Sequence, residues 1–281
     1  MINLNGEIVN QEEAKISILN RGFAYGDSVF ETIRVVNGKI MFWEDHYFRL
    51  MASMRIMRME IPSTFSPEFL EKEIKEITEA NGLSDATARV RFAIYRQYGG
   101  YYTPATRDIG YVLSVEGMDS PFYLLNEEPY EIELFKDHYV NSGLLSTIKS
   151  NNRAVNVLGS IFARENGYDN CLLLNEKKSV VEALNGNIFL VKENIIKTPP
   201  LTDGALNGII RKQLINILKK MDNYKLEETS ISPFELQKAD ELFITNVAVG
   251  IQPVSKYRKK EFGNAAAKEL LSKLNVKARL G

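Results

Sequence analysis

Cysteine, histidine and tryptophan are scarce in this sequence, with one, two and one copies among 281 residues. The lone Cys171 cannot form an intramolecular disulfide, which fits a reducing compartment. It lies in the apolar run Asn170–Leu174 and is interpreted as a small core residue. One cysteine and two histidines cannot supply the usual zinc ligand sets, so no metal is expected.

Charge of one sign and long hydrophobic runs are also lacking. The formal net charge is −1, and no stripe of lysine and arginine indicates a nucleic-acid partner. The N-terminal stretch MINLNGEIVN has no basic region followed by an apolar run, and no segment approaches membrane length. These absences predict a cytoplasmic protein without a membrane partner.

What is present is concentrated between Ser146 and Arg211. Lys149 lies in a run with little other charge, and Glu182 follows the apolar pair Val180 and Val181 thirty-three residues later. A partly desolvated lysine amine can form a Schiff base with a carbonyl, and a buried carboxylate requires a cationic partner. Gly208 opens a predicted helix, whose free N–H groups suit a phosphate. Lysine, acid and phosphate seat together indicate a pyridoxal-phosphate site.

The order of these motifs resembles the class-IV aminotransferases, the fold-type IV pyridoxal-phosphate enzymes. The resemblance rests on the segments Lys149-Ser150-Asn151-Asn152-Arg153, Val181-Glu182 with Asn187-Ile188-Phe189, Thr198-Pro199-Pro200-Leu201 and Leu206-Asn207-Gly208-Ile209-Ile210-Arg211. It continues through RGFAYGDSVFETIR near the N-terminus and covers nearly the whole chain. It implies an α+β fold with a small N-terminal α/β domain and a larger C-terminal domain with a barrel-like sheet.

Local patterns predict the elements of the N-terminal half. Asn5-Gly6 and Asn37-Gly38 predict turns between short strands. A helix is expected from about Asp45, and another over residues 67–81. Strands are expected over residues 88–96 and 109–115, and a linker over 118–126. The predicted domains are therefore residues 1–117 and 127–281.

The C-terminal half alternates strands and helices. Helices are predicted over residues 152–165, 211–221 and 263–274, and strands from 129 to 135 and on both sides of a loop within 240–254. The loop in the last segment resembles a family block that contacts cofactor and substrate.

Arginines are the strongest candidates for anion binding in the N-terminal half. Arg49 follows His46 in a His-x-x-Arg-Leu element, in which the family uses the arginine to hold the cofactor phosphate; a guanidinium can bind two phosphate oxygens at once. On local pattern alone, Arg49 is a solvated helix residue and His46 a packing residue. Arg91 and Arg96 lie on one predicted strand and are candidates either for a substrate carboxylate or for structural ion pairs.

The resemblance also assigns roles position by position. Lys149 is expected to carry the cofactor and act as general base and acid, and Glu182 to keep the pyridine nitrogen protonated. The cofactor-binding candidates are Arg49, Lys149, Glu182, Asn187, Leu206, Gly208, Ile209, Ile210, Thr245 and Asn246. The substrate-binding candidates are Phe30, Thr32, Arg91, Arg96, Tyr101, Val247 and Ala248.

The exact reaction has two readings. An aminotransferase would move an amino group between an amino acid, branched-chain-like or similar, and a 2-oxo acid. An aminodeoxychorismate lyase would make 4-aminobenzoate and pyruvate, and Asn152-Arg153 and Thr245-Asn246 resemble that group. A non-catalytic binding protein with the same fold is a third and remote alternative. The residues that bind the substrate carboxylate in the D-amino acid enzymes are replaced here by Phe30, Tyr101 and Thr103.

The segment Tyr98-Gly99-Gly100-Tyr101-Tyr102 predicts an apolar loop at the mouth of the site. Tyrosines favour interfaces because the ring is buried while the hydroxyl finds a partner. Together with the resemblance, this loop predicts a homodimer with the active site near the subunit interface.

Overall fold

The N-terminal half begins with the predicted hairpin, in which β1 (Ile2–Leu4) pairs with β2 (Glu7–Val9) in a computed structural model that describes residues 1–280. Asn5 and Gly6 both have positive φ, 55° and 92°, which suits a tight hairpin turn. A second Asn-Gly turn, at Asn37-Gly38, joins β3 (Ser28–Val36) to β4 (Lys39–Ile40). Both predicted hairpins are therefore present.

Contacts divide the chain into two units. The first comprises residues 1–121 and 148–152, and the second comprises residues 122–147 and 153–281. The domain boundaries expected from the sequence did not include the return of residues 148–152, which carry Lys149, to the first unit.

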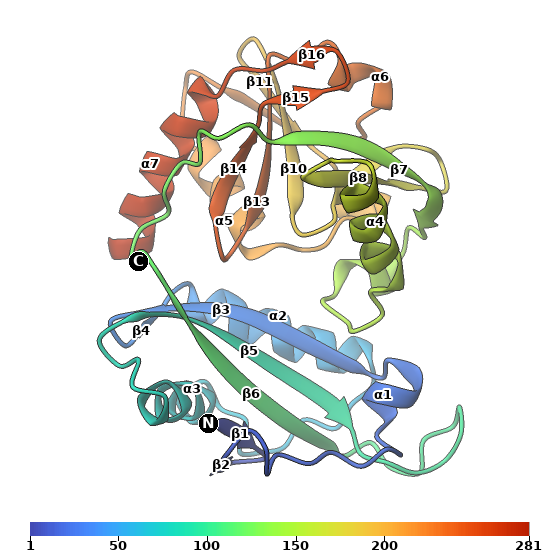
Figure 1. Cartoon of the computed structure of the whole chain (residues 1–281), viewed down its shortest axis with the longest axis vertical. Helices are drawn as coiled ribbons and strands as arrows, with labels where there is room; N and C mark the ends of the chain where they lie inside the picture. Colours follow the sequence, from blue (N-terminus) through green and yellow to red (C-terminus); the bar gives the residue numbers. More distant parts are fainter. Residues whose placement is uncertain (281) are drawn as a thin grey trace. The chain divides into compact units, whose positions relative to one another are not determined.

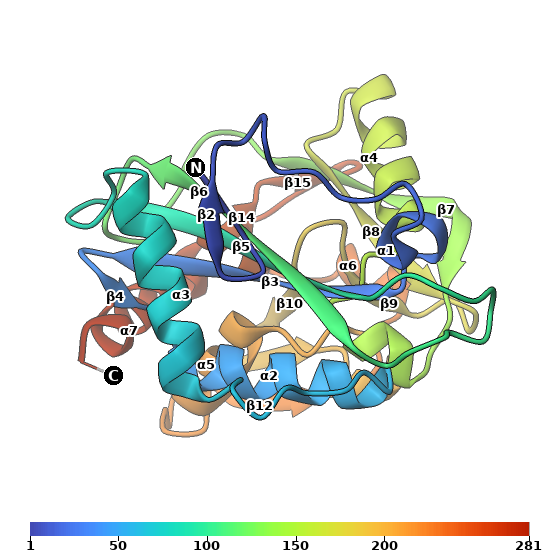
Figure 2. The same cartoon turned by 90° about the horizontal axis from the view of Figure 1, so that it is seen from below.

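The first unit is built on a six-stranded antiparallel sheet in the order β2-β1-β6-β5-β3-β4. Its long strands β5 (Thr87–Arg96) and β6 (Ile109–Met118) pair with each other, and β5 also pairs with β3 (Figure 2). Apolar residues of α2 (Trp43–Ile56) and α3 (Pro67–Ala80) pack against this sheet in one core, which includes Met54, Ile74 and Phe92. Pro67 follows the N-cap Ser66, whose side chain accepts from the Phe69 N–H, and this cap explains where α3 begins.

The strand β3 alternates between two environments. Val29, Ile33 and Val35 belong to the core under the helices, so Phe30 and Thr32 point to the opposite face. Arg91 of β5 lies opposite Thr32 in the antiparallel register, which places their side chains on the same face. This second face of the sheet therefore gathers three of the substrate-binding candidates.

The second unit contains two five-stranded sheets that share a core. One has the order β12-β11-β10-β13-β14 and the other β16-β15-β7-β8-β9. Their bounds are β7 Glu131–Val140, β8 Asn170–Asn175, β9 Val180–Ala183, β10 Asn187–Lys192, β11 Ile195–Thr198, β12 Lys225–Glu228, β13 Glu241–Asn246, β14 Gly250–Val254, β15 Lys256–Tyr257 and β16 Lys260–Glu261. Leu172 and Val180 from one sheet and Ile188 and Leu242 from the other belong to a single cluster. The sheets curl around this cluster (Figure 1), which confirms the predicted barrel-like architecture.

Helices of the second unit occur where periodicity predicted them. They are α4 (Ala154–Glu165), α5 (Ile209–Leu218) and α7 (Ala265–Leu280). Two short helices are also present, α1 (Arg21–Tyr25) in the first unit and α6 (Pro233–Leu236) in the second. The terminal helix α7 runs beyond the predicted end at residue 274. None of the helices within residues 1–280 is long and apolar enough to span a membrane.

Candidate active site

The segment that carries Lys149 is attached to the start of β3 by backbone hydrogen bonds. The Phe30 N–H donates to the Lys149 carbonyl at 2.8 Å, and the Asn151 N–H donates to the Ser28 carbonyl at 3.0 Å. Val29 and Ser150 form an isolated antiparallel bridge. Lys149 thus lies in an irregular segment whose backbone is bonded to the sheet on both sides of it.

The ring of Phe30 lies beside two cationic side chains. The Lys149 Nζ is 4.5 Å from the ring centroid, and the Arg91 guanidinium carbon is 3.8 Å from it. An aromatic ring attracts cations to its face and displaces water around them. Burial and the neighbouring Arg89 lower the pKa of Arg91.

Asn151 is a site residue to which the sequence assigned no role. Its Nδ2 donates to Ser28 Oγ at 2.6 Å, and its Oδ1 accepts from Arg91 Nη2 at 3.1 Å. It therefore links the Lys149 segment, β3 and β5. The only signal in the sequence was its place two residues after Lys149.

Arg96 is not brought together with Arg91. The two residues are five positions apart on β5, so their side chains leave opposite faces of the sheet. Arg96 donates to both oxygens of Asp27, at 2.8 and 3.2 Å, and to the carbonyls of Met57 and Arg58. These contacts are those of a buried structural ion pair, and the substrate role of Arg96 stays a prediction that this geometry does not support.

Arg49 belongs to a buried charged group on the helix-covered face of the first unit. Its Nε donates to Glu31 Oε1 at 2.8 Å and its Nη2 to Oε2 at 2.5 Å. His46, one helical turn earlier on α2, contacts Glu31 Oε2 through Nδ1 at 2.7 Å. Burial by itself would raise the pKa of Glu31, but Arg49 and His46 outweigh it and set that pKa to about 2. Burial lowers the pKa of His46.

The partner of Arg49 was also missed by sequence reasoning. Glu31 shares its strand parity with the core residues Val29 and Ile33, so a buried carboxylate facing α2 could have been expected. Residues 46 and 49 lie on one helix face. The parity and the helix spacing together would have predicted the group.

The N-terminus of α5 is open to an anion. Its N-cap is Gly208, no side chain caps it, and no acidic residue lies in its first turn. The first N–H groups of a helix have no partner inside the helix, and here they belong to Ile209 and Ile210. The sequence pattern predicted that this helix begins at Arg211. The helix begins two residues earlier, so the amides of Ile209 and Ile210 lie at its start.

Thr245 lies on the sheet next to Asn187. The two residues face each other across β10 and β13, so their side chains share one face of the sheet. The Thr245 hydroxyl oxygen is buried and has no hydrogen-bond partner among the described residues. A buried polar atom of this kind indicates a missing ligand or water.

Glu182 and Asn187 both bond the backbone of Leu206. The Leu206 N–H donates to Glu182 Oε2 at 2.9 Å, and Asn187 Nδ2 donates to the Leu206 carbonyl at 2.8 Å. The side chains of Glu182 and Asn187 are buried. The structure thus brings together Glu182, Asn187, Leu206 and Gly208, all within the second unit.

The loop after β13 is ordered by Asn246. Its Oδ1 accepts from the Ala248 N–H at 3.0 Å and the Val249 N–H at 3.1 Å. This turn fixes the backbone of Val247 and Ala248, which are substrate-binding candidates. Asn246 therefore stabilises the turn of its own loop.

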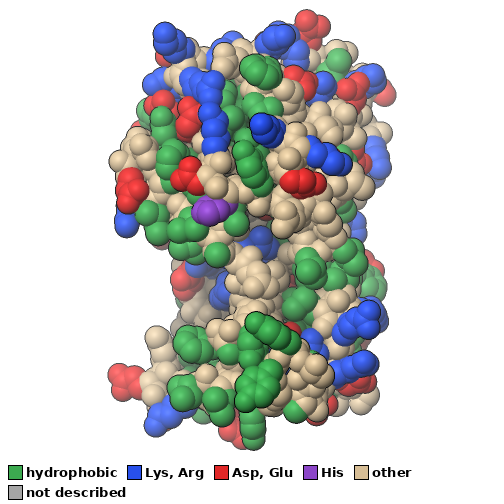
Figure 3. Space-filling view, turned by 90° about the vertical axis from the view of Figure 1, so that its right-hand side faces the viewer, with side chains coloured by type: hydrophobic (Ala, Val, Ile, Leu, Met, Phe, Trp, Pro, Cys, Tyr) green, Lys and Arg blue, Asp and Glu red, His purple; other side chains and the backbone are tan. Residues whose placement is uncertain are grey.

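The backbone of the tyrosine loop in the first unit is held by Arg21, and its tyrosine side chains are exposed. Arg21 Nη1 donates to the carbonyls of Gly99, Gly100 and Tyr101, the last at 2.6 Å. The side chains of Tyr101 and Tyr102 are 85% and 91% exposed. Apolar side chains gather on the face of the molecule that carries this loop and α1 (Figure 3).

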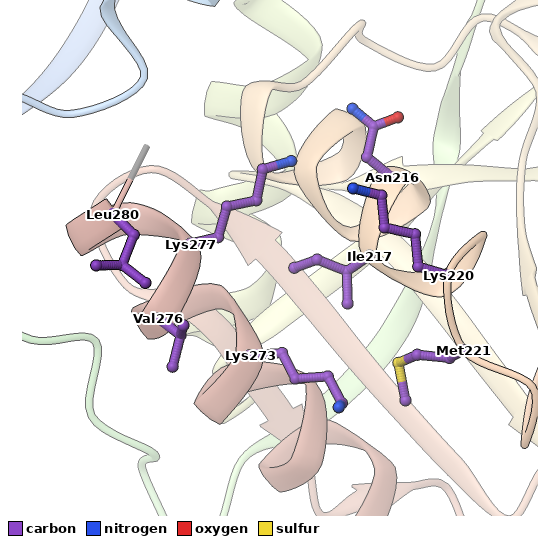
Figure 4. Close-up of a pocket in the computed structure, with 8 residues that line it drawn as sticks. All are labelled: Asn216, Ile217, Lys220, Met221, Lys273, Val276, Lys277 and Leu280. Atoms are coloured by element: carbon purple, nitrogen blue, oxygen red, sulfur yellow. The ribbon is translucent and has the colours of Figure 1, made fainter.

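A pocket of about 410 Å³ lies elsewhere, between the C-terminal end of α5 and α7 (Figure 4). Its lining residues are Asn216, Ile217, Lys220, Met221, Lys273, Val276, Lys277 and Leu280. None of them is a predicted site residue. The pocket is therefore separate from the groups described above.

Comparisons with known proteins identify the family. The family model described as "Amino-transferase class IV" matches residues 28–257. A Methanocaldococcus jannaschii protein named "Putative branched-chain-amino-acid aminotransferase" is 31% identical over 276 residues, covering 98% of this chain and 94% of the other. A D-alanine aminotransferase of Listeria monocytogenes is 26% identical over 261 residues, covering 90% and 86%.

Solved structures agree in fold. A branched-chain amino acid aminotransferase from T.th., solved with pyridoxamine 5'-phosphate, has a TM-score of 0.88 and 27% identity over 99% of this chain and 94% of its own. A Legionella pneumophila structure titled as a putative 4-amino-4-deoxychorismate lyase has a TM-score of 0.81 at 24% identity, covering 95% and 97%. The latter likeness shows the fold alone.

The chain belongs to the class-IV aminotransferases. The recognition made from its motifs is confirmed, and so is the fold-type IV architecture.

Proposed function

We propose that this enzyme transfers the amino group of a branched-chain or similar apolar amino acid to a 2-oxo acid. It is an aminotransferase that uses pyridoxal 5'-phosphate. The observation that carries the substrate proposal is the likeness to a branched-chain aminotransferase over almost the full length of both chains. The lyase alternative is not favoured, because curated relatives are aminotransferases.

The residues present fit this cofactor. The uncapped N-terminus of α5 and the unpartnered Thr245 hydroxyl provide donors for a phosphate. Glu182 is a buried carboxylate that accepts from the Leu206 N–H, and a carboxylate of this kind can bond a protonated pyridine nitrogen. Bound pyridoxal phosphate supplies an electron sink for the carbanion at the substrate α-carbon.

In this proposal Lys149 holds the cofactor and moves the proton at the substrate α-carbon. The Phe30 ring beside Nζ covers one side of the amine. Backbone hydrogen bonds to β3 fix the position of the chain at Lys149. A base that is held in place and partly desolvated suits proton transfer near neutral pH.

Arg49 is proposed to bind the cofactor phosphate, with Glu31 setting its orientation. Two of the three guanidinium nitrogens bond Glu31, so the plane of the group is fixed before any ligand binds. His46 supports Glu31 from the same helix. Ile209, Ile210 and Thr245 are the proposed phosphate contacts of the second unit.

Arg91 and Thr32 are the proposed substrate contacts on the second face of the sheet, which also carries Phe30. The Arg91 guanidinium is stacked on Phe30 and bonded to Asn151, which fixes it for a carboxylate. Tyr101, Val247 and Ala248 remain proposed substrate contacts on sequence grounds.

The substrate assay tests the proposal directly. The purified protein, supplied with pyridoxal phosphate, is given L-leucine, L-isoleucine, L-valine or D-alanine with 2-oxoglutarate or pyruvate, and separately aminodeoxychorismate. We expect the L-branched-chain amino acids to react fastest. Preference for D-alanine would contradict the substrate proposal, and 4-aminobenzoate formation would restore the lyase.

We also propose a homodimer. The exposed tyrosine loop and the exposed Phe23 of α1 form an apolar surface that is typical of an interface. The expected occupant is a second copy of this chain.

A further inference from the structure

The inference concerns Asn187, a buried residue at the start of β10. Its Nδ2 donates to the Leu206 carbonyl at 2.8 Å. The N–H of the same Leu206 donates to Glu182 Oε2 at 2.9 Å. One residue of the loop before α5 is therefore bonded on one side to the carboxylate and on the other to Asn187.

The same asparagine also determines what can stand at position 208. A Cβ added to Gly208 would lie 2.0 Å from Asn187 Oδ1, and the other close atoms are Asn187 Cγ at 3.2 Å and Arg211 Cβ at 3.5 Å. Gly208 has φ −72° and ψ 141°, a conformation open to any residue. A side chain at position 208 would therefore force the Asn187 side chain to move.

We propose that Asn187 is a positioning residue that holds the Glu182 carboxylate and the N-terminus of α5 in a fixed relation through Leu206. The Gly208 N–H donates to the Leu206 carbonyl at 2.8 Å, so Leu206 and the helix N-cap move together. A shift of this loop would change the carboxylate contact and the phosphate seat at the same time. The inference rests on the proposed roles of Glu182 and the α5 N-terminus in cofactor binding.

The experiment is a double-mutant cycle on the affinity for pyridoxal phosphate, measured by absorbance titration of the apoprotein. Asn187→Ala removes the side-chain donor to the buried Leu206 carbonyl, which keeps only the Gly208 N–H, and should raise the dissociation constant roughly tenfold. Gly208→Ala should raise it by at least as much. In the Asn187→Ala background, Gly208→Ala should add less than about twofold, because the obstructing side chain is gone.

Pyridoxal, which lacks the phosphate, separates the effect on the phosphate seat from the effect on the Glu182 carboxylate. The Gly208→Ala penalty should be smaller for pyridoxal but not absent, because the alanine also displaces the Asn187 side chain that acts on Glu182 through Leu206. The Asn187→Ala penalty should persist, because Asn187 also acts on Glu182 through Leu206. Asn170→Ala is the matched control, since Asn170 is equally buried in the second unit and bonds Tyr130 and Asn185 instead.

Several results would overturn the inference. They are an equal Gly208→Ala penalty in both backgrounds, an Asn187→Ala affinity within about twofold of wild type, or an equal loss in Asn170→Ala. Asn187→Ser, with a hydroxyl too short to reach Leu206, replaces Asn187→Ala if that variant does not fold. A wild-type protein that binds no pyridoxal phosphate would instead refute the proposed function.

Discussion

The Phe30 N–H donates a hydrogen bond of 2.8 Å to the Lys149 carbonyl, and the Lys149 Nζ lies 4.5 Å from the centroid of the Phe30 ring. Backbone and side chain of the lysine are therefore both positioned by one residue of β3. The chain returns to the first unit for only five residues, and these carry the proposed reactive amine.

Lys149→Ala should lower turnover by at least about a hundredfold, because it removes the general base. It should still bind pyridoxal phosphate, through the phosphate seat. Borohydride reduction of the wild-type enzyme followed by peptide mapping should find the pyridoxyl label on Lys149. Lys178→Ala, in a surface turn, should retain activity; label on Lys177 or Lys178 would refute the assignment.

Glu182→Gln should lower kcat by about a hundredfold, which corresponds to about 3 kcal/mol. The substitution removes the negative charge and keeps an oxygen that can accept from Leu206. Glu241→Gln is the control, because Glu241 is buried in the same unit but accepts from the N–H groups of Ala266 and Ala267. Turnover of Glu182→Gln within about threefold of wild type would show that the glutamate is structural.

Glu31→Gln should destabilise the protein in a pH-dependent way. The folded pKa of Glu31 is about 2, below the reference value of 4.5, so its contribution is present above pH 4.5 and is lost as the pH falls toward 2. Its size is about 3 kcal/mol. Urea unfolding of wild type and variant should differ most near pH 7 and converge as the pH approaches that folded pKa.

The exposed pair Arg89–Glu116 provides the control for that measurement. Glu116→Gln should change the free energy of unfolding by less than about 1 kcal/mol. A Glu31→Gln difference that is no larger, or that grows as the pH falls, would contradict the assigned ion pair.

Cys171 should be unreactive in the native protein. It is fully buried in β8, and burial raises the pKa of its thiol to about 11. The thiolate is the reactive form of cysteine. A thiol reagent at pH 8 should label the protein only after unfolding; rapid labelling of native enzyme would show that β8 opens.

Tyr101→Asp combined with Tyr102→Asp should weaken the proposed dimer and lower activity in parallel, because two charges would enter an apolar interface. Light scattering and activity are measured on the same samples. Tyr139→Asp, at a partly exposed position in the second unit, serves as the control. A fully active monomer at assay concentration would rule out a site that depends on the partner.

Much of the local structure could be predicted because its causes are local. Asn-Gly pairs specify tight turns, and Ser66-Pro67 specifies the start of α3. The motif from Leu206 to Arg211 predicted a helix entry suited to phosphate, and the helix begins at Ile209. These signals operate within a few residues, so the sequence contains them completely.

The contacts of the site could not be predicted in this way, because they join residues far apart in the sequence. Arg91 and Arg96 could not be distinguished from the sequence pattern. Their side chains leave opposite faces of β5, and of the two it is Arg96 that bonds Asp27. Gly208 looked like a phosphate-loop glycine, but the tertiary structure shows that a side chain there would meet Asn187 Oδ1.

The sequence by itself determined the family and much of the order of the elements, and the lysine, glutamate and arginine of the proposed chemistry were chosen from it alone. The tertiary structure alone decided that Glu31 binds Arg49, that residues 148–152 join β3, and that Leu206 connects Glu182 to Asn187. The reason is physical. Turns, caps and periodicity follow from neighbouring residues, whereas partners in a sheet and in a buried charged group depend on how distant strands pair and which face each presents.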